Sequence, residues 1–182
     1  MEKLRTQVGN DDQEVTIWFP QKSTALSENT FWEIIDLLDW QSEDSANIST
    51  RAITKISQLS VAEIQAFDDI LSEKLYLLDG KEYAENTGQN AYKSDDAPFS
   101  VDGFLYARCM AVASGKITYE EIVEDPARMI KNSTFEPLLS LASRAYKLKT
   151  GKIYEHNPAY IYETFANTKG WDNKDFLSTL LH

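Results

Sequence analysis

Three carboxylates in the middle of the chain have the chemistry to hold a divalent cation. Asp95, Asp96 and Asp102 lie close together in the sequence, and carboxylate oxygens are the ligands that hard cations prefer. Their spacing does not match a calcium-binding loop, which needs alternating ligands and a closing glutamate. We favour the simpler interpretation, in which Asp95 and Asp96 lie in a solvated loop and Asp102 stabilises the first turn of a helix through its dipole.

Arg108 follows Asp102 by less than two helical turns and lies among apolar residues. An arginine in such a position is expected either to pair with a carboxylate inside the protein or to bind an anion with its planar fork. We favour the structural pair, with Asp102 or another carboxylate as the partner. The alternative is a small-ligand or catalytic pocket formed by Asp102, Tyr106 and Arg108.

The remaining reactive side chains do not form a recognised catalytic or metal-binding pattern. The two histidines, His156 and His182, would require the last residue of the chain as a zinc ligand. No Gly-x-Ser-x-Gly elbow and no glycine-rich phosphate loop occurs. Cys109 falls on an apolar helix face, where an inert core thiol is expected. We therefore predict no catalytic residue, no metal and no cofactor, and we lean against an enzyme.

Length and composition predict one folded domain, residues 1–182, with a loose terminus over residues 1–13. Hydrophobic residues make up 42% of the 182-residue chain, enough for a real core. The formal net charge of −11 disfavours nucleic acid and anionic membranes as partners. No apolar signal segment, no run of about 20 apolar residues and no second cysteine occurs. These features predict a soluble, cytoplasmic protein.

Positive charge is concentrated in residues 128–152. This segment has six basic side chains and one acidic side chain, a net charge of +5, which leaves −16 on the rest of the chain. Cations near a helix C-terminus suit the helix dipole, which explains part of the pattern without a ligand. The other explanation is self-association, in which an acidic face of one copy meets the basic face of another.

Apolar residues at every third or fourth position predict an all-α fold, an irregular multi-helix bundle with at most one short N-terminal β-strand. The strand candidate is residues 14–20, which are β-branched and aromatic and end at a proline. Capping boxes at Thr30, Ser60 and Thr118 are expected to open three of the helices. The predicted helices cover residues 30–40, 47–56 or 49–56, 61–78, 81–92, 102–114, 118–124, 137–150, 159–166 and 173–181.

Several of these segments resemble a known family. The residues that carry the resemblance are Phe31–Ile35, Leu59–Asp68, Asp102–Arg108, Gly115 and the pair Asp125–Pro126. Over about residues 30–140 the order of elements is similar to that of a bacterial family of helical proteins, domain of unknown function 4240. The resemblance implies an α-helical fold and a bacterial cytosolic protein, and it implies no activity.

Two classes of function are consistent with these observations, and a purely structural oligomer is a third possibility. The first is a non-catalytic binding or accessory protein, whose acidic surface meets a basic protein partner or a second copy of the chain. The second is a small-ligand binder or enzyme that uses the pocket near Asp102, Tyr106 and Arg108. The candidate ligand- or partner-binding residues are Asp95, Asp96, Asp102, Tyr106 and Arg108.

Overall fold

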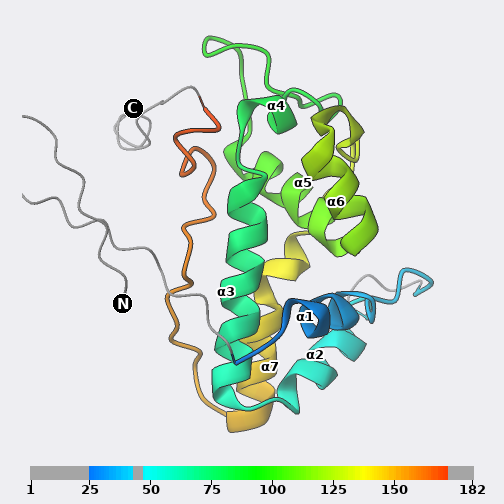
Figure 1. Ribbon diagram of the computed structural model, residues 1–182, viewed down its shortest axis with the longest axis vertical. Coiled ribbons are helices and arrows are strands. Elements are labelled where there is room, and N and C mark those ends of the chain that lie inside the picture. The colour runs from blue at the N-terminus through cyan, green and yellow to red at the C-terminus, as the bar shows by residue number, and fades with distance from the viewer. Residues whose placement is uncertain (1–24, 43–46, 172–182) are drawn as a thin grey trace, which may run out of the picture.

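The longest helix forms the axis of the molecule. Apolar residues recur every three or four positions in α3 (Val61–Leu77), and Ile64, Phe67, Leu71 and Leu75 are buried along one side of it. Ser60 and Glu63 form the predicted capping box at its N-terminus. In the computed structural model, which describes residues 25–42 and 47–171, the other helices pack around this one (Figure 1).

The helices lie in two groups along α3. Near its N-terminal end are α1 (Glu28–Ile35), α2 (Thr50–Ser57) and α7 (Leu141–Thr150), with α2 and α7 packed against each other. Near its other end are the elements of the middle of the chain: α4 (Lys81–Ala84), α5 (Val101–Ala113), α6 (Lys116–Glu124) and the 3-10 turn η1 (Pro126–Arg128). A second 3-10 turn, η2 (Glu136–Ser140), packs on α5 and leads into α7.

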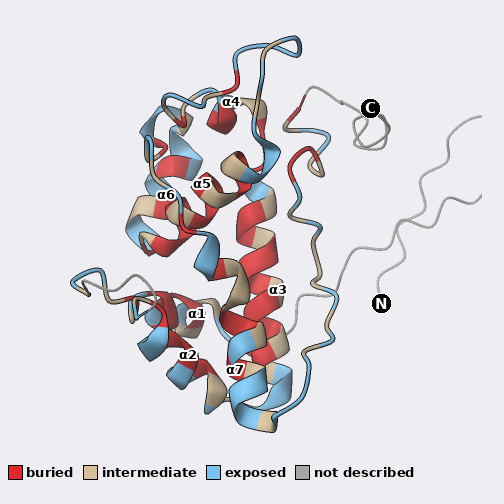
Figure 2. Cartoon of the chain, turned by 180° about the vertical axis from the view of Figure 1, so that it is seen from behind, coloured by how far each residue is buried: buried red, intermediate tan, exposed pale blue. Residues whose placement is uncertain are grey.

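The all-α prediction is confirmed, because the described residues contain helices and no strand. The strand candidate at residues 14–20 and the helix predicted at 173–181 lie outside the described residues. The buried surfaces face one another across the centre of the bundle, and exposed residues lie on its outside (Figure 2).

Two helix starts differ from the capping boxes predicted for them. The first helix begins after Ser27, whose hydroxyl accepts a hydrogen bond from the backbone N–H of Thr30. The sixth begins directly after Gly115, which has a φ of 92°, so Thr118 lies inside the helix. In both cases a turn just upstream already starts the helix, so Thr30 and Thr118 fall within it.

The prediction of a helix over residues 159–166 is wrong. Residues 151–171, here called the strap, have no regular secondary structure and run along α3 from the end of α7 toward α4 (Figures 1 and 2). Two backbone N–H groups of the strap, those of Ala159 and Tyr160, donate to Asp69 and Ser72 of α3. Side chains of α3 accept hydrogen bonds from these two N–H groups, so the two groups do not need partners within a helix.

Candidate functional site

Arg108 lies on the buried face of α5 and is fully buried. Its Nη1 donates to the backbone carbonyl of Leu75 at 2.9 Å, and its Nη2 donates to the Thr164 hydroxyl at 3.0 Å. The Phe104 ring lies 4.8 Å from the guanidinium carbon. Burial lowers the pKa of Arg108 from its usual value, and the nearby Asp79 carboxylate opposes this shift. Arg108 thus joins α3, α5 and the strap.

Asp79 is the acidic partner of Arg108 and the main anchor of the strap. Its carboxylate is fully buried, 4.0 Å from Nη2 of Arg108. It accepts hydrogen bonds from the backbone N–H groups of Phe165 and Asn167 and from the indole N–H of Trp171. Three donors and one cation compensate the burial of this charge. The arrangement is the structural ion pair that we favoured for Arg108, with Asp79 in place of Asp102.

The structure does not gather the predicted site residues into one pocket. Asp102 lies in the first turn of α5 and is exposed, whereas Arg108 faces the interior. Asp95 and Asp96 are exposed in the loop before α5, where Asp95 accepts a hydrogen bond from the Tyr92 hydroxyl. Tyr106 is half-buried, and its backbone carbonyl accepts a hydrogen bond from Phe135. A role for Asp95, Asp96, Asp102 and Tyr106 in binding stays a prediction.

A second cluster of titratable groups lies halfway along α3. The Asp68 carboxylate accepts a hydrogen bond from the Tyr154 hydroxyl at 3.2 Å, and its neighbour Asp69 lies 2.8 Å from His156 Nε2. Burial raises the pKa of Asp68 to about 6, and His156 and the Tyr154 hydrogen bond oppose that rise. Burial likewise raises the pKa of Tyr154 above its usual value. This cluster fastens the first half of the strap to α3.

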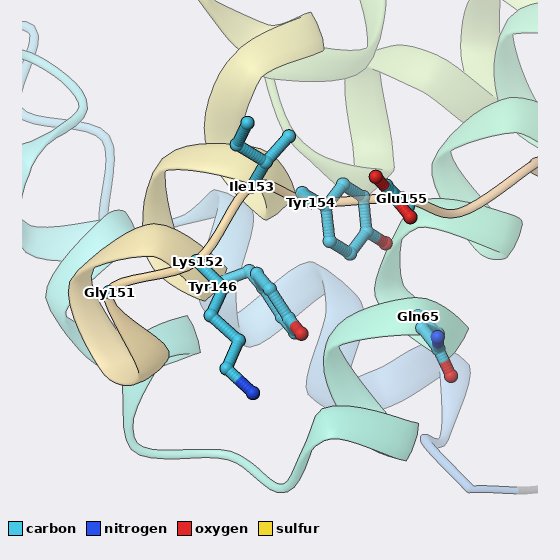
Figure 3. Close-up of a pocket in the computed structure, with 7 residues that line it drawn as sticks. All are labelled: Gln65, Tyr146, Gly151, Lys152, Ile153, Tyr154 and Glu155. Atoms are coloured by element: carbon cyan, nitrogen blue, oxygen red, sulfur yellow. The ribbon is translucent and has the colours of Figure 1, made fainter.

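Next to this cluster is an open pocket of about 560 Å³. It lies between the end of α7, the first turns of α3 and the start of the strap (Figure 3). The tyrosine rings of Tyr146 and Tyr154 are 5.2 Å apart at their centres and form one wall. The lining residues are Gln65, Tyr146, Gly151, Lys152, Ile153, Tyr154 and Glu155.

The pocket adjoins a surface that we call the basic face. All charged residues of α2, of α7 and of residues 151–153 are basic, and all of them are exposed. Two aliphatic side chains on this surface are also largely exposed, Leu148 at 63% and Ile153 at 82%. Leu148 continues the spacing of the buried Leu141 and Ala145 on α7, yet it faces solvent. The basic face consists of Arg51, Lys55, Arg144, Lys147, Lys149 and Lys152, with Leu148 and Ile153.

Acidic side chains are more widely distributed than basic ones. They occur on α1, α3, α4 and α6 and in the loop before α5. Several of those on α6 are paired, as in the contacts of Glu120 with Lys116 and of Glu121 with Arg128. The concentrated charge on the described residues is therefore the positive charge of the basic face.

Sequence reasoning missed the two acidic positions that organise the strap. Asp79 lies just beyond α3 and before Gly80, a position typical of a solvated helix end. Asp68 is a charged residue next to the apolar positions of α3, yet it is only 8% exposed. The aromatic and histidine residues of the segment 154–171 were the available signal, because such side chains in an irregular segment need partners.

A comparison with protein families identifies the chain. Residues 26–148 match the family described as protein of unknown function (DUF4240). The chain belongs to this family. No curated protein and no solved structure matches the chain. The matched region contains every helix of the described residues except the last two residues of α7, and the strap follows it.

Neither a membrane-spanning helix nor a metal-binding cluster occurs among the described residues. No helix in residues 25–42 and 47–171 has the length and apolarity needed to cross a membrane. In the same ranges, no group of three or more His, Cys, Asp or Glu side chains is arranged to hold a metal ion. Cys109, the cysteine within these ranges, is buried, and burial raises the pKa of its thiol to about 12.

Proposed function

We propose that this protein is a non-catalytic binding module, and that its basic face recognises an acidic segment of a partner protein. The supporting observation is the separation of charge. A chain with a net charge of −11 presents only basic charges on α2, on α7 and on residues 151–153. Complementary charge attracts and orients a partner, and desolvated apolar contacts add affinity.

The exposed aliphatic side chains favour a protein partner over a simple polyanion. Leu148 and Ile153 lie among the lysines and are mostly exposed. A nucleic-acid backbone has no apolar group to cover them and is repelled by the rest of this acidic chain. A segment that alternates acidic and aliphatic residues satisfies both the charges and the exposed carbon surface.

The residues near Asp102 support a weaker case for small-ligand binding. Both terminal nitrogens of Arg108 already donate to protein oxygens. An anion at this position would have to replace contacts that hold the strap. We therefore base no function on Asp102, Tyr106 and Arg108.

Charge reversal on α7 tests the proposal. The probe is a fluorescein-labelled 12-residue peptide of alternating glutamate and leucine, and binding is measured by fluorescence anisotropy at low salt. K147E/K149E is expected to weaken binding at least tenfold, because it removes two cations and adds two repulsive charges to the basic face. The matched control is K93E/K131E, which changes the net charge equally at two exposed lysines outside this face.

The control is expected to bind within twofold of the parent protein. Raising the salt concentration should weaken the parent complex, because screening shortens the range of surface electrostatics. Equal loss in the two double variants would contradict recognition by the basic face. Absence of peptide binding by the parent protein at low salt would refute the proposed function.

A further inference from the structure

The pocket beside the basic face has polar groups that no described residue engages. No hydrogen bond or ion pair within the described residues involves the Tyr146 hydroxyl, the Lys152 ammonium or the Gln65 side-chain amide. In Figure 3 the Tyr146 and Lys152 side chains extend from one side toward the first turns of α3, and Gln65 comes from α3 itself. All three groups can donate hydrogen bonds.

Tyr154 has a different part in the pocket. Its hydroxyl donates to Asp68, so the ring contributes an apolar wall rather than a free polar group. The centres of the Tyr146 and Tyr154 rings are 5.2 Å apart. Aromatic walls of this kind cover the methylene groups of a ligand, while its polar end meets the donors.

The charges around the pocket favour an anion at its Lys152 side. Lys149 and Lys147 lie on the adjacent last turns of α7 and add positive potential. Among the acidic residues around the pocket, Glu63 belongs to the Ser60 capping box, and Asp68 accepts a hydrogen bond from the Tyr154 hydroxyl. Glu155 lies beyond Tyr154 from the Lys152 ammonium in Figure 3. The Lys152 cation and the Tyr146 hydroxyl suit a carboxylate, which accepts several hydrogen bonds at once, whereas the Gln65 amide lies across the pocket and points away from them in Figure 3.

We propose that this pocket binds a single carboxylate, that of a glutamate or aspartate side chain in the acidic partner segment. The inference rests on the proposed function and deepens it, because it assigns one position of the segment to a specific subsite. The long exposed side chains of the basic face attract the segment, and the pocket fixes its register. Tyr146 and Lys152 are the residues that contact the carboxylate.

A substitution series in the peptide tests this assignment. Each glutamate of the probe peptide is changed in turn to glutamine, and each peptide is titrated against the parent protein, Y146F, K152Q and R144Q. Y146F removes the hydroxyl and keeps the ring, and K152Q removes the charge. R144Q is the matched control, because it removes one charge from the basic face at a residue that does not line the pocket.

We expect one glutamate position to stand out. Its change to glutamine should weaken binding to the parent protein and to R144Q about tenfold, but should weaken binding to Y146F and K152Q less than threefold. This coupling identifies the two side chains as direct partners of that carboxylate. The other positions should show equal, smaller losses with all four proteins.

The outcomes separate this inference from the proposed function. Salt-sensitive peptide binding without a coupled position would overturn the assignment of one carboxylate to the pocket. It would leave the basic face as the docking surface. Absence of any peptide binding would overturn both. Free glutarate is tested as a competitor, because it offers the same carboxylate chemistry. Binding of glutarate as tightly as the peptide would assign the pocket to a small dicarboxylate and overturn recognition of a partner segment.

Discussion

Asp68 and Asp69 are neighbours in the sequence but lie in different environments. Asp68 is almost fully buried beneath Tyr154, whereas Asp69 is partly exposed and contacts His156 and the backbone of Ala159. Burial makes the ionised form of Asp68 costly, so its pKa rises to about 6. The difference follows from one residue of helical rotation, about 100°, on the strap-facing side of α3.

Asp68→Asn is expected to stabilise the protein at pH 8. The folded state holds a proton on Asp68 between its usual pKa of 3.8 and about 6, while the unfolded state does not, so stability falls as the pH rises through this window. Asparagine has no charge to bury and can still accept from Tyr154. The gain should be on the order of 2 kcal/mol at pH 8 and should vanish near pH 4.

Urea unfolding of the parent protein and Asp68→Asn at both pH values measures this difference. Comparing the two proteins cancels the pH dependence of the groups that do not interact with Asp68. If Asp68→Asn were more stable than the parent protein at pH 4 but not at pH 8, the raised pKa of Asp68 would be refuted.

Asp79→Asn should lower the free energy of unfolding by about 3 kcal/mol or more, because it leaves the buried Arg108 without a counter-charge. It also replaces one of the two acceptor oxygens that hold the strap by a donor. Chemical denaturation measures the loss, and chymotrypsin cleavage at the aromatic residues of the strap should accelerate. The exposed Asp96→Asn is the control. Equal behaviour of the two variants would show that Asp79 does not anchor the strap.

The sequence indicates the burial of Arg108 but not its partners. Its position among Phe104, Leu105 and Cys109 predicts an interior ion pair, and the structure has one. Its contacts, however, are Leu75, Asp79 and Thr164, the last of them 56 residues away. Helical spacing relates only residues a few positions apart. It therefore suggests Asp102 as the partner of Arg108 and cannot predict a carboxylate that is distant in the sequence.

At the scale of elements, helices with a strong apolar period are predictable and the strap is not. The residues of α1 and α2 carry their burial pattern in their own spacing, as with Ala52, Ile53 and Ile56 on the buried side of α2. The strap instead takes its conformation from acceptors on another element, and Phe165 has a φ of 75°, which a helix does not allow. Local propensity favoured a helix at 159–166, and tertiary hydrogen bonds outweigh it.

The start of α6 gives a prediction at this scale. Gly115→Ala should destabilise the protein by about 1 to 3 kcal/mol, because φ is 92° at this position and an added methyl group would lie 3.3 Å from Asp36. Thr118→Ala is the control and should change stability by less than about 0.5 kcal/mol. Thermal unfolding distinguishes the two. A larger loss of stability for Thr118→Ala than for Gly115→Ala would support the capping box that the sequence predicts at Thr118.

At the scale of the whole molecule, the strap completes the core of the matched region. Trp171 is almost fully buried, and its ring packs against Phe104 and Phe165. The family match ends at residue 148, before any of these strap contacts. The matched region by itself therefore has an incomplete core and an Asp79 carboxylate without its three donors.

A chain that ends at Gly151 is expected to lose cooperative unfolding. Removal of the strap exposes the aromatic surface of α5 and takes three hydrogen-bond donors from Asp79, whereas a typical domain has only about 5 to 15 kcal/mol of stability. Calorimetry and the binding of a hydrophobic dye compare it with the full chain. A cooperative transition at an unchanged temperature would show that the bundle folds without the strap.

The charge of the whole molecule was partly predictable. Residues 128–152 stand out as basic in the sequence, and four of their cations belong to the basic face. The contribution of Arg51 and Lys55 was not predictable, because it depends on the packing of α2 against α7.

The anchoring of Trp171 to Asp79 also affects the order of events during synthesis. The ribosome makes α3 and α5 before the strap residues that donate hydrogen bonds to Asp79. At that stage the Asp79 carboxylate lies at the centre of the future core without these donors. Final closure of the bundle must wait until the indole has left the exit tunnel.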